Sequence, residues 1–174
     1  MSPLLEKINQ SSVEAFTEIF QDIFESSPWI PQHAFASRPF IHINDIFKEM
    51  QQVLNNAPTE KKLELIRAHP ELGKKIKMSV TSTQEQKNAG LSTLTEDEYN
   101  QFLTCNQNYQ TKFQFPFIIA VADHTKSEIL QIMRLRLVNT YEEEVQIALK
   151  EINRIAELRF AQLVKNMEAI QITE

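Results

Sequence analysis

The clearest shortage in this 174-residue chain is glycine, which occurs only twice, at Gly73 and Gly90. Tight β-hairpin turns favour glycine at positive φ, and loops that cradle phosphate groups need several glycines in a cluster. Nucleotide-binding folds built on such loops are therefore not expected. Cysteine is rarer still, because Cys105 stands alone and cannot form a disulfide within the chain. A single thiol suits a reducing compartment such as the cytoplasm.

Long apolar stretches and positive charge are also lacking. No segment approaches the roughly 20 apolar residues that span a membrane, and the first residues, MSPLLEKINQ, lack the apolar core of a signal peptide. The formal net charge is −5, which gives no general attraction for nucleic acid or anionic lipid. The histidines show no i, i+4 pairing, so no metal site is expected. We expect a cytoplasmic protein that binds neither nucleic acid nor membrane.

What the chain has in abundance is helical patterning. Apolar residues repeat at helical spacing, and Ser or Thr three residues before Glu, the capping-box pattern, marks helix starts. The capping pairs are Ser11/Glu14, Ser82/Glu85, Thr95/Glu98, Thr125/Glu128 and Thr140/Glu143. The expected helices cover about 13–23, 43–54, 59–68, 83–89, 96–111, 126–138 and 141–168. The sequence predicts an all-α fold: a compact single-domain bundle (1–174) of about seven to nine helices with a long C-terminal helix.

Three stretches complete this prediction. Residues 25–42 and 69–82 are the longest irregular segments, and long loops on a helical scaffold are where sites tend to lie. The apolar run 113–121 contains Pro116, which disfavours a central strand, so we expect a buried extended loop. Gly90 is a candidate helix C-cap, and the run Glu142–Glu144 fits the start of the last helix, where negative charge is favoured.

One arginine of the last predicted helix lies on the face that should be buried. At about 100° per residue, Arg159 falls within the apolar stripe that includes Ala148, Ile152 and Ala156, whereas Arg154 falls on the opposite face. A guanidinium in the core needs partners, because an unpaired buried charge costs several kcal/mol. Arg159 therefore belongs to a structural ion pair, extends its head group out to solvent, or binds an anionic or carbonyl-rich ligand through its planar fork.

A histidine stands at a predicted helix end. His69 precedes Pro70, and proline disfavours helical geometry in the residue before it, so the preceding helix should end here. An imidazole at the mouth of a loop can act as an acid or base near neutral pH, or it can simply cap the helix. Glu85 fits the capping box with Ser82, whereas Gln86 beside it either contacts a ligand or is solvated.

Five segments carry a resemblance to a known family. They are FESSPWI (24–30), LIRAHPELG (65–73), STQEQKNAGL (82–91), KFQFPFIIAV (112–121) and RLVNTYEEEVQIALKEINRIAELR (136–159). In this order they resemble the 2-oxo-4-hydroxy-4-carboxy-5-ureidoimidazoline (OHCU) decarboxylases, which belong to the pathway from urate to allantoin. Two departures stand out. Gln114 lies where many members have glycine, and ADHT at 122–125 replaces a glycine-containing continuation.

The resemblance implies an all-helical decarboxylase, often a homodimer, that converts OHCU to (S)-allantoin and carbon dioxide without a metal or organic cofactor. Carried over residue by residue, the family's catalytic residues fall on His69, Glu85 and Arg159. We expect these side chains to converge around one pocket that binds a small molecule. The family's ligand contacts fall on Pro70, Ser82, Gln86, Ile118, Ile119 and Ala120.

Two other functions are consistent with the residues. A helical domain with a buried arginine and an apolar loop could bind a small anion or a partner without catalysis, and it would tolerate His69→Asn. The same fold could also act on another ureido or imidazoline acid. The departures at Gln114 and 122–125 leave this second alternative open.

Overall fold

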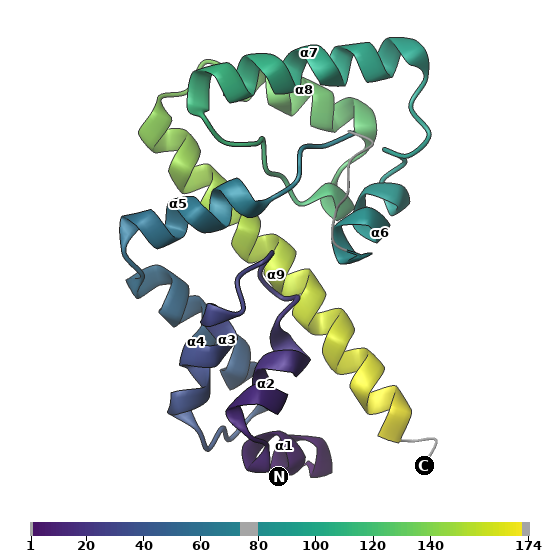
Figure 1. Ribbon diagram of the computed structural model, residues 1–174. Coiled ribbons are helices and arrows are strands. Elements are labelled where there is room, and N and C mark those ends of the chain that lie inside the picture. Colours follow the sequence, from purple (N-terminus) through teal and green to yellow (C-terminus); the bar gives the residue numbers. More distant parts are fainter. Residues whose placement is uncertain (1, 74–79, 172–174) are drawn as a thin grey trace. The chain divides into compact units, whose positions relative to one another are not determined.

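The structure is a computed structural model that describes residues 2–73 and 80–171. Within these ranges it contains nine α-helices, two short 3-10 helices and no strand, which confirms the all-α prediction (Figure 1). The longest helix is the last, α9 (Tyr141–Gln171). No helix in the described ranges has an apolar stretch long enough to cross a bilayer. Contacts divide the chain into two units, residues 1–62 with 153–174 and residues 63–152, so α9 contributes to both.

The first unit is built around phenylalanine side chains. Its elements are α1 (Pro3–Gln10), α2 (Val13–Phe20), α3 (Trp29–Ala34), the 3-10 helix η1 (Phe35–Ser37), α4 (Ile43–Asn56) and the second part of α9. The ring centroids of Phe16 and Phe20 lie 4.8 Å apart. Phe160 of α9 stacks on Phe47 of α4 at 5.3 Å. The apolar spacing of α2, α4 and α9 predicts that each helix has one buried face, and these rings lie on those faces.

Three details of the first unit differ from the sequence prediction. Helix α1 is not predicted, although Ser2 caps it and Pro3 occupies its first turn, both favourable at a helix start. Helix α2 is capped by Ser12 instead of the predicted Ser11, because Ser11 already closes α1 by donating to the Ile8 carbonyl at 2.7 Å. The predicted irregular stretch 25–42 contains α3 and η1, where Ile30 supplies a buried apolar anchor.

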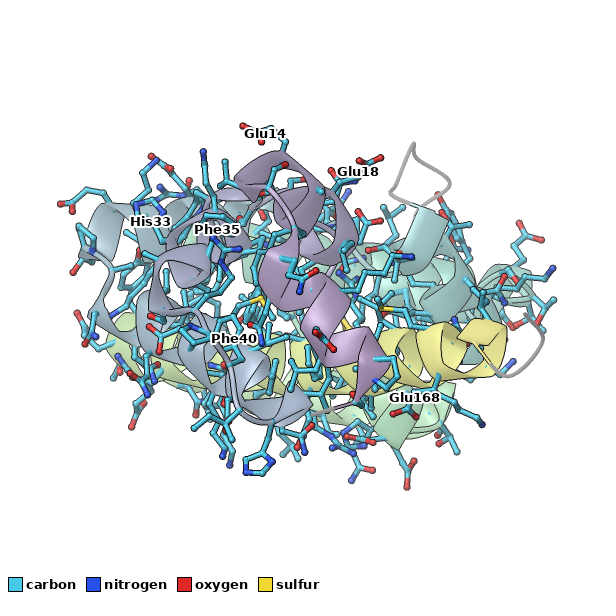
Figure 2. The ribbon with its side chains drawn as sticks, turned by 90° about the horizontal axis from the view of Figure 1, so that it is seen from below. Glu14, Glu18, His33, Phe35, Phe40 and Glu168 are labelled. Carbon is cyan, nitrogen blue, oxygen red and sulfur yellow. The ribbon has the colours of Figure 1, made fainter. Side chains whose placement is uncertain are left out.

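His33 of α3 lies at the edge of the first unit. Its side chain is exposed, as are those of Glu14 and Glu18, which point away from the helices in Figure 2. The Nδ1 atom of His33 lies 2.7 Å from the carbonyl oxygen of Trp29, one helical turn earlier. His33 is thus an exposed histidine bound to its own helix backbone.

The second unit contains most of α5 (Thr59–Ala68), then α6 (Val80–Asn88), α7 (Glu96–Phe113), the 3-10 helix η2 (Val121–Asp123), α8 (Lys126–Arg136) and the first part of α9. The capping boxes predicted at Thr95/Glu98, Thr125/Glu128 and Thr140/Glu143 are confirmed. At each of the last two, the threonine backbone N–H lowers the pKa of the paired glutamate carboxyl. The capping-box pattern in the sequence therefore predicts the first residues of α7, α8 and α9 correctly.

Helix α6 begins earlier than predicted. Its first residue is Val80, so Ser82 lies inside the helix and the capping box predicted for Ser82 and Glu85 is wrong. Its end agrees with prediction, since Gly90 adopts φ +77° and the Leu91 N–H donates to the Gln86 carbonyl at 2.9 Å. Of the predicted loop 69–82, residues 74–79 lie outside the described residues.

Candidate active site

His69 directly follows the last residue of α5, as predicted, and it is only 8% exposed. Its Nδ1 lies 2.9 Å from the carbonyl oxygen of Leu65. A carbonyl oxygen only accepts hydrogen bonds, so Nδ1 must carry a proton, and in the neutral ring Nε2 is then the basic nitrogen. His69 therefore caps its helix, as one alternative predicts. The same bond fixes the ring orientation and tautomer, as proton transfer requires.

The loop that follows His69 is held by Gln86 of α6. The side-chain oxygen of Gln86 accepts a hydrogen bond from the Gly73 N–H at 3.0 Å, and its amide nitrogen donates to the Glu71 carbonyl at 3.4 Å. Gln86 is 6% exposed, so the alternative in which its side chain is solvated is wrong. These bonds tie the segment that begins with His69 to the helix that carries Glu85.

A second amide holds the same loop from α7. Asn106, 3% exposed, donates from Nδ2 to the Leu72 carbonyl at 2.8 Å. Sequence reasoning missed this residue, although a signal exists. Asn106 lies four residues after Phe102 and three before Tyr109, so it interrupts the apolar stripe of α7. A polar side chain within such a stripe needs a specific partner.

Ser82 and Glu85 project from the same side of α6 as Gln86, because residues three and four apart are neighbours on a helix. Ser82 is 4% exposed and Glu85 is half-buried. Helix α6 packs against η2, which directly follows Ala120. The second unit thus brings together three segments with predicted site residues: the His69 loop, α6 and the loop that ends at Ala120.

Residues 115–120 form the buried extended loop that the sequence predicts, with no helix or strand. Buried backbone groups need hydrogen-bond partners, and two long side chains provide them. The Ile118 carbonyl accepts from Nη1 of Arg136 at 2.8 Å, and the Ala120 N–H donates to Oε2 of Glu151 at 2.8 Å. Side chains therefore fix this backbone in place of a regular ladder.

Ile119 stands between these two anchored residues. Its side chain is buried, at 3% exposure, and its backbone N–H and C=O form no hydrogen bond within residues 2–73 and 80–171. A buried backbone donor and acceptor without a protein partner call for water or a ligand. The resemblance assigns Ile119 to substrate contact, and its backbone N–H and C=O are the groups that could make this contact.

Gln114 opens this loop in the left-handed helical conformation, with φ 59°. Glycine is the residue that most often ends a helix in this conformation. The departure from the family's glycine therefore leaves the expected backbone path possible. The Gln114 side chain offsets part of the cost by donating to the carbonyls of Gln110 and Thr111 at 3.3 and 2.9 Å.

A buried cluster that the sequence analysis does not predict holds the loop from α8. Arg136, the last residue of α8, is 7% exposed. Its Nε and Nη2 atoms donate to the Glu144 carboxylate at 2.8 to 3.2 Å, while Nη1 donates to Ile118 as described. The guanidinium carbon also lies 4.4 Å from the ring centroid of Phe117. Arg136 thus contacts two consecutive loop residues.

Glu144 is fully buried and has two further partners. It accepts hydrogen bonds from the Tyr109 hydroxyl and from Nδ2 of Asn139, the latter at 2.7 Å. Burial, and then the bond to Glu144, raise the pKa of Tyr109, so its hydroxyl stays protonated and donates. The prediction that residues 142–144 open the last helix is confirmed, because all three glutamates lie in the first turn of α9. Glu144 differs from the other two in being buried. This residue lies one turn before Ala148, on the buried stripe of α9.

Arg159 lies in the first unit and is 8% exposed, which confirms its predicted inward position. Its Nη2 donates to Oε2 of Glu25 at 3.0 Å, and its Nη1 donates to the Asp22 carbonyl at 3.1 Å. The ion pair that one alternative predicts is therefore present. His69 and Glu85 belong to the other unit, and their convergence with Arg159 stays a prediction.

No cluster of three or more His, Cys, Asp or Glu residues suited to a metal ion occurs in the described ranges. The expectation of a metal-free and cofactor-free site stays a prediction.

Comparisons with known proteins agree with the ordered segments. A family model described as OHCU decarboxylase matches residues 9–161. A 2-oxo-4-hydroxy-4-carboxy-5-ureidoimidazoline decarboxylase from Halalkalicoccus jeotgali is 38% identical over 167 residues, which cover 96% of this chain and 95% of that protein. The uric acid degradation bifunctional protein PucL of Bacillus subtilis is 41% identical over 160 residues. That match covers 92% of this chain but 32% of PucL, so the chain spans about a third of the bifunctional protein.

A solved structure shares the fold. The crystal structure of an (S)-allantoin synthase aligns with a TM-score of 0.71 at 25% sequence identity. The alignment covers 91% of this chain and 53% of that one. Sequence and fold therefore point to the same family.

Proposed function

The chain belongs to the OHCU decarboxylase family and is a carboxy-lyase of urate degradation, and we propose that His69, Glu85 and Arg159 carry its catalysis. The substrate is 2-oxo-4-hydroxy-4-carboxy-5-ureidoimidazoline. The products that we propose are (S)-allantoin and carbon dioxide.

The chemistry of the substrate explains how such a reaction proceeds without a cofactor. The carboxylate is attached to a carbon next to a ring C=N. When the bond to the carboxylate breaks, carbon dioxide leaves and the electron pair moves into the C=N. The substrate thus supplies the electron sink that pyridoxal or thiamine provides in other decarboxylases. The protein has to orient the substrate, stabilise the developing negative charge and deliver a proton to one face of the intermediate.

We assign proton transfer to His69. It would take the substrate's hydroxyl proton or deliver a proton to the intermediate, and such catalysis typically contributes about 10²–10⁴-fold. The observation that carries this role is the bond from His69 Nδ1 to the Leu65 carbonyl. That bond makes Nε2 the basic nitrogen of the neutral ring and fixes the ring orientation, while Gln86 fixes the loop that follows His69.

The other roles follow from side-chain chemistry. Glu85 would orient His69 or bind the ureido N–H groups of the substrate, since a carboxylate accepts such bonds. Arg159 would bind a carboxylate or carbonyl oxygen and stabilise negative charge, and its bonds to Glu25 and Asp22 hold the guanidinium in one orientation. The remaining proposed contacts with the substrate are made by Pro70, Ser82, Gln86, Ile118, Ile119 and Ala120.

The test compares two histidines that both bond to a backbone carbonyl four residues earlier. The unstable substrate is generated in place by urate oxidase and the hydrolase that follows it, and the appearance of optical activity is recorded. His69→Asn should lower kcat by at least about 10²-fold. His33→Asn, at the exposed histidine with the equivalent Trp29 bond, should leave kcat unchanged. Glu85→Gln is measured beside Glu96→Gln, an exposed position at the start of α7.

Three outcomes decide the proposal. If wild type does not accelerate the formation of optical activity, the substrate assignment is wrong, and another ureido or imidazoline acid should be tested beside it. If His69→Asn is folded and as active as wild type, His69 is not the acid–base residue. If the product has the opposite sign of optical rotation, the assignment to the S enantiomer fails.

We also propose that the chain is a single domain that acts as a homodimer in the cytoplasm. The two units share α9, which should couple their unfolding, and each carries one convenient probe: Trp29 and Cys105. Trp29 fluorescence and thiol reactivity should therefore change at the same urea concentration.

Dimer formation is supported by Leu135 and Val138, which are 62% and 82% exposed. Sedimentation of wild type and Val138→Asp tests the dimer, and cell fractionation tests the compartment.

A further inference from the structure

We propose that Arg136 is a positioning residue, whose guanidinium sets the place of the loop 115–120 and thereby the affinity for substrate. This inference rests on the proposed function, because loop position matters for turnover only if the loop contacts substrate. Arg136 need not touch the substrate itself. It would act through Ile118, whose carbonyl it binds at 2.8 Å.

The first support is that one guanidinium binds two neighbouring loop residues in different ways. It lies over the ring of Phe117, 4.4 Å from the centroid, and it donates to the carbonyl of the next residue, Ile118. A ring contact restrains the side chain, and a hydrogen bond restrains the backbone. No helix or strand holds this part of the chain. The loop conformation therefore depends on side-chain contacts such as these.

The second support is that the guanidinium itself cannot easily turn. Its Nε and Nη2 atoms bind both oxygens of Glu144, which is 0% exposed. Tyr109 and Asn139 in turn fix the carboxylate. Buried ion pairs are weak evidence for stability, because well-packed apolar residues of the same size often stabilise a fold equally well. The cluster is better explained as a device that selects one loop conformation.

The third support comes from the other side of the loop. The Ala120 N–H is held by Glu151 at 2.8 Å, so the residues on both sides of Ile119 are anchored. Ile119 lies between them, with a buried backbone that lacks partners within the described ranges. Each of the two peptide groups that flank Ile119 is thus anchored through one of its polar groups, while the Ile119 N–H and C=O have no partner in the described ranges. Such an arrangement suits a preorganised ligand contact, because the ordering cost is met before binding.

Arg136→Lys is the sharpest variant. Lysine keeps the positive charge that Glu144 requires, but its ammonium is a compact point charge without the planar fork. It can therefore pair with Glu144 but cannot also bind the Ile118 carbonyl and the Phe117 ring. The matched control is Arg134→Lys, two residues earlier on α8. Arg134 is exposed and donates to Gln101 at 2.8 Å, away from the loop.

Two measurements are made on each folded protein. In the first, steady-state kinetics of Arg136→Lys should show KM raised about tenfold, the effect of losing one charge-assisted hydrogen bond, with kcat changed by less than about threefold. In the second, amide hydrogen exchange of Ile119 and Ala120 should become about tenfold faster, while amides in the middle of α7 keep their wild-type rates. Arg134→Lys should match wild type in both measurements.

The proposal is overturned if Arg136→Lys has the KM and loop exchange of wild type. It is also overturned if exchange rises equally in the loop and in α7, because that result indicates general destabilisation. Exchange does not depend on turnover, so it tests the loop even if wild type is inactive towards OHCU and the proposed function fails. Should Arg136→Lys not fold, Tyr109→Phe removes only the hydroxyl that fixes Glu144. This variant should raise KM about threefold and speed loop exchange, as expected for one lost neutral hydrogen bond, and unchanged values would equally overturn the proposal.

Discussion

The two buried arginine–glutamate pairs within residues 2–73 and 80–171 are built differently. In the second unit, Arg136 binds both oxygens of Glu144, a residue eight positions later in the sequence. In the first unit, Arg159 donates from one terminal nitrogen to Glu25, 134 residues away, and from the other to the Asp22 carbonyl. One pair joins the end of α8 to the start of α9. The other joins α9 to the segment between α2 and α3.

The difference shows that burial alone does not reveal what an arginine does. A fork bound to both oxygens of one carboxylate is committed to that partner, and Arg136 uses its remaining terminal nitrogen to hold a loop. Two groups, the Glu25 carboxylate and the Asp22 carbonyl, orient the Arg159 guanidinium, which we propose binds the substrate. We therefore expect substitutions at Arg136 to change binding, and substitutions at Arg159 to change the chemical step.

The largest effect on stability is expected for Glu144→Ala. The substitution leaves the Arg136 guanidinium buried without its carboxylate, which should lower the free energy of unfolding by about 3–5 kcal/mol. Urea unfolding followed by circular dichroism measures this change. Glu142→Ala, at an exposed position in the same turn of α9, should change it by less than about 0.5 kcal/mol. If Glu144→Ala lowers the free energy of unfolding by less than about 1 kcal/mol, Arg136 does not depend on Glu144 as its partner.

Arg159→Lys should lower kcat by about 10²-fold, the typical effect of removing a donor that stabilises charge in the transition state. Lysine can still pair with Glu25, so the thermal midpoint should fall by only a few degrees. The kinetic pattern should differ from that of Arg136→Lys, where KM is the parameter that changes. Arg154→Lys, on the exposed face of α9, provides the control. If Arg159→Lys keeps wild-type kcat, Arg159 is structural and the two pairs are functionally alike.

The contrast between these arginines also shows what the sequence could predict. Arg159 was identifiable because a charge interrupts an apolar helical stripe. Arg136 satisfies the same rule, since it lies three residues after Met133 and seven after Ile129 on the buried face of α8. Glu144 was hidden because two exposed glutamates precede it, and the run as a whole resembles a helix start. A search for charged residues on every apolar stripe would have found the pair.

Other contacts of the site could not have been predicted by this route. Capping boxes and Pro116 determine where α7, α8 and the loop begin and end, because these signals are local. The hydrogen bonds between Gln86 and Gly73 and between Asn106 and Leu72 depend on how α6 and α7 pack beside residues 69–73. Helical periodicity shows which face is buried but not what that face meets.

The third prediction concerns Tyr109, which fixes Glu144. A tyrosine in the unfolded chain loses its proton near pH 10, whereas the raised pKa of Tyr109 keeps it protonated in the fold. The folded state then binds one more proton, so this contribution to stability is complete below about pH 10 and is lost as pH rises, by about 1.4 kcal/mol per pH unit. Urea unfolding of wild type and Tyr109→Phe at about pH 9 and 11 compares the two slopes. Equal slopes would show that Tyr109 does not donate to Glu144 in solution.

The smallest effect is expected at the entrance to the loop that Arg136 holds. The left-handed conformation of Gln114 costs an L-residue about 1–2 kcal/mol, and glycine avoids that cost but loses about 0.5–1 kcal/mol in backbone entropy. Because Gln114→Gly also loses the side-chain bonds to Gln110 and Thr111, it should raise the free energy of unfolding by no more than about 1 kcal/mol. Gln114→Ala keeps the strained φ of 59° and loses the side-chain bonds to Gln110 and Thr111, so it should not stabilise the protein.

The kinetics of Gln114→Gly then separate two explanations of loop position. If Arg136 determines where the loop lies, KM should stay at its wild-type value, because the Ile118 carbonyl keeps its guanidinium partner whatever residue opens the loop. If KM instead rises as far as in Arg136→Lys, the backbone at the entrance controls the loop. The buried pair of the second unit would then be structural, and its contrast with Arg159 would lose its functional meaning.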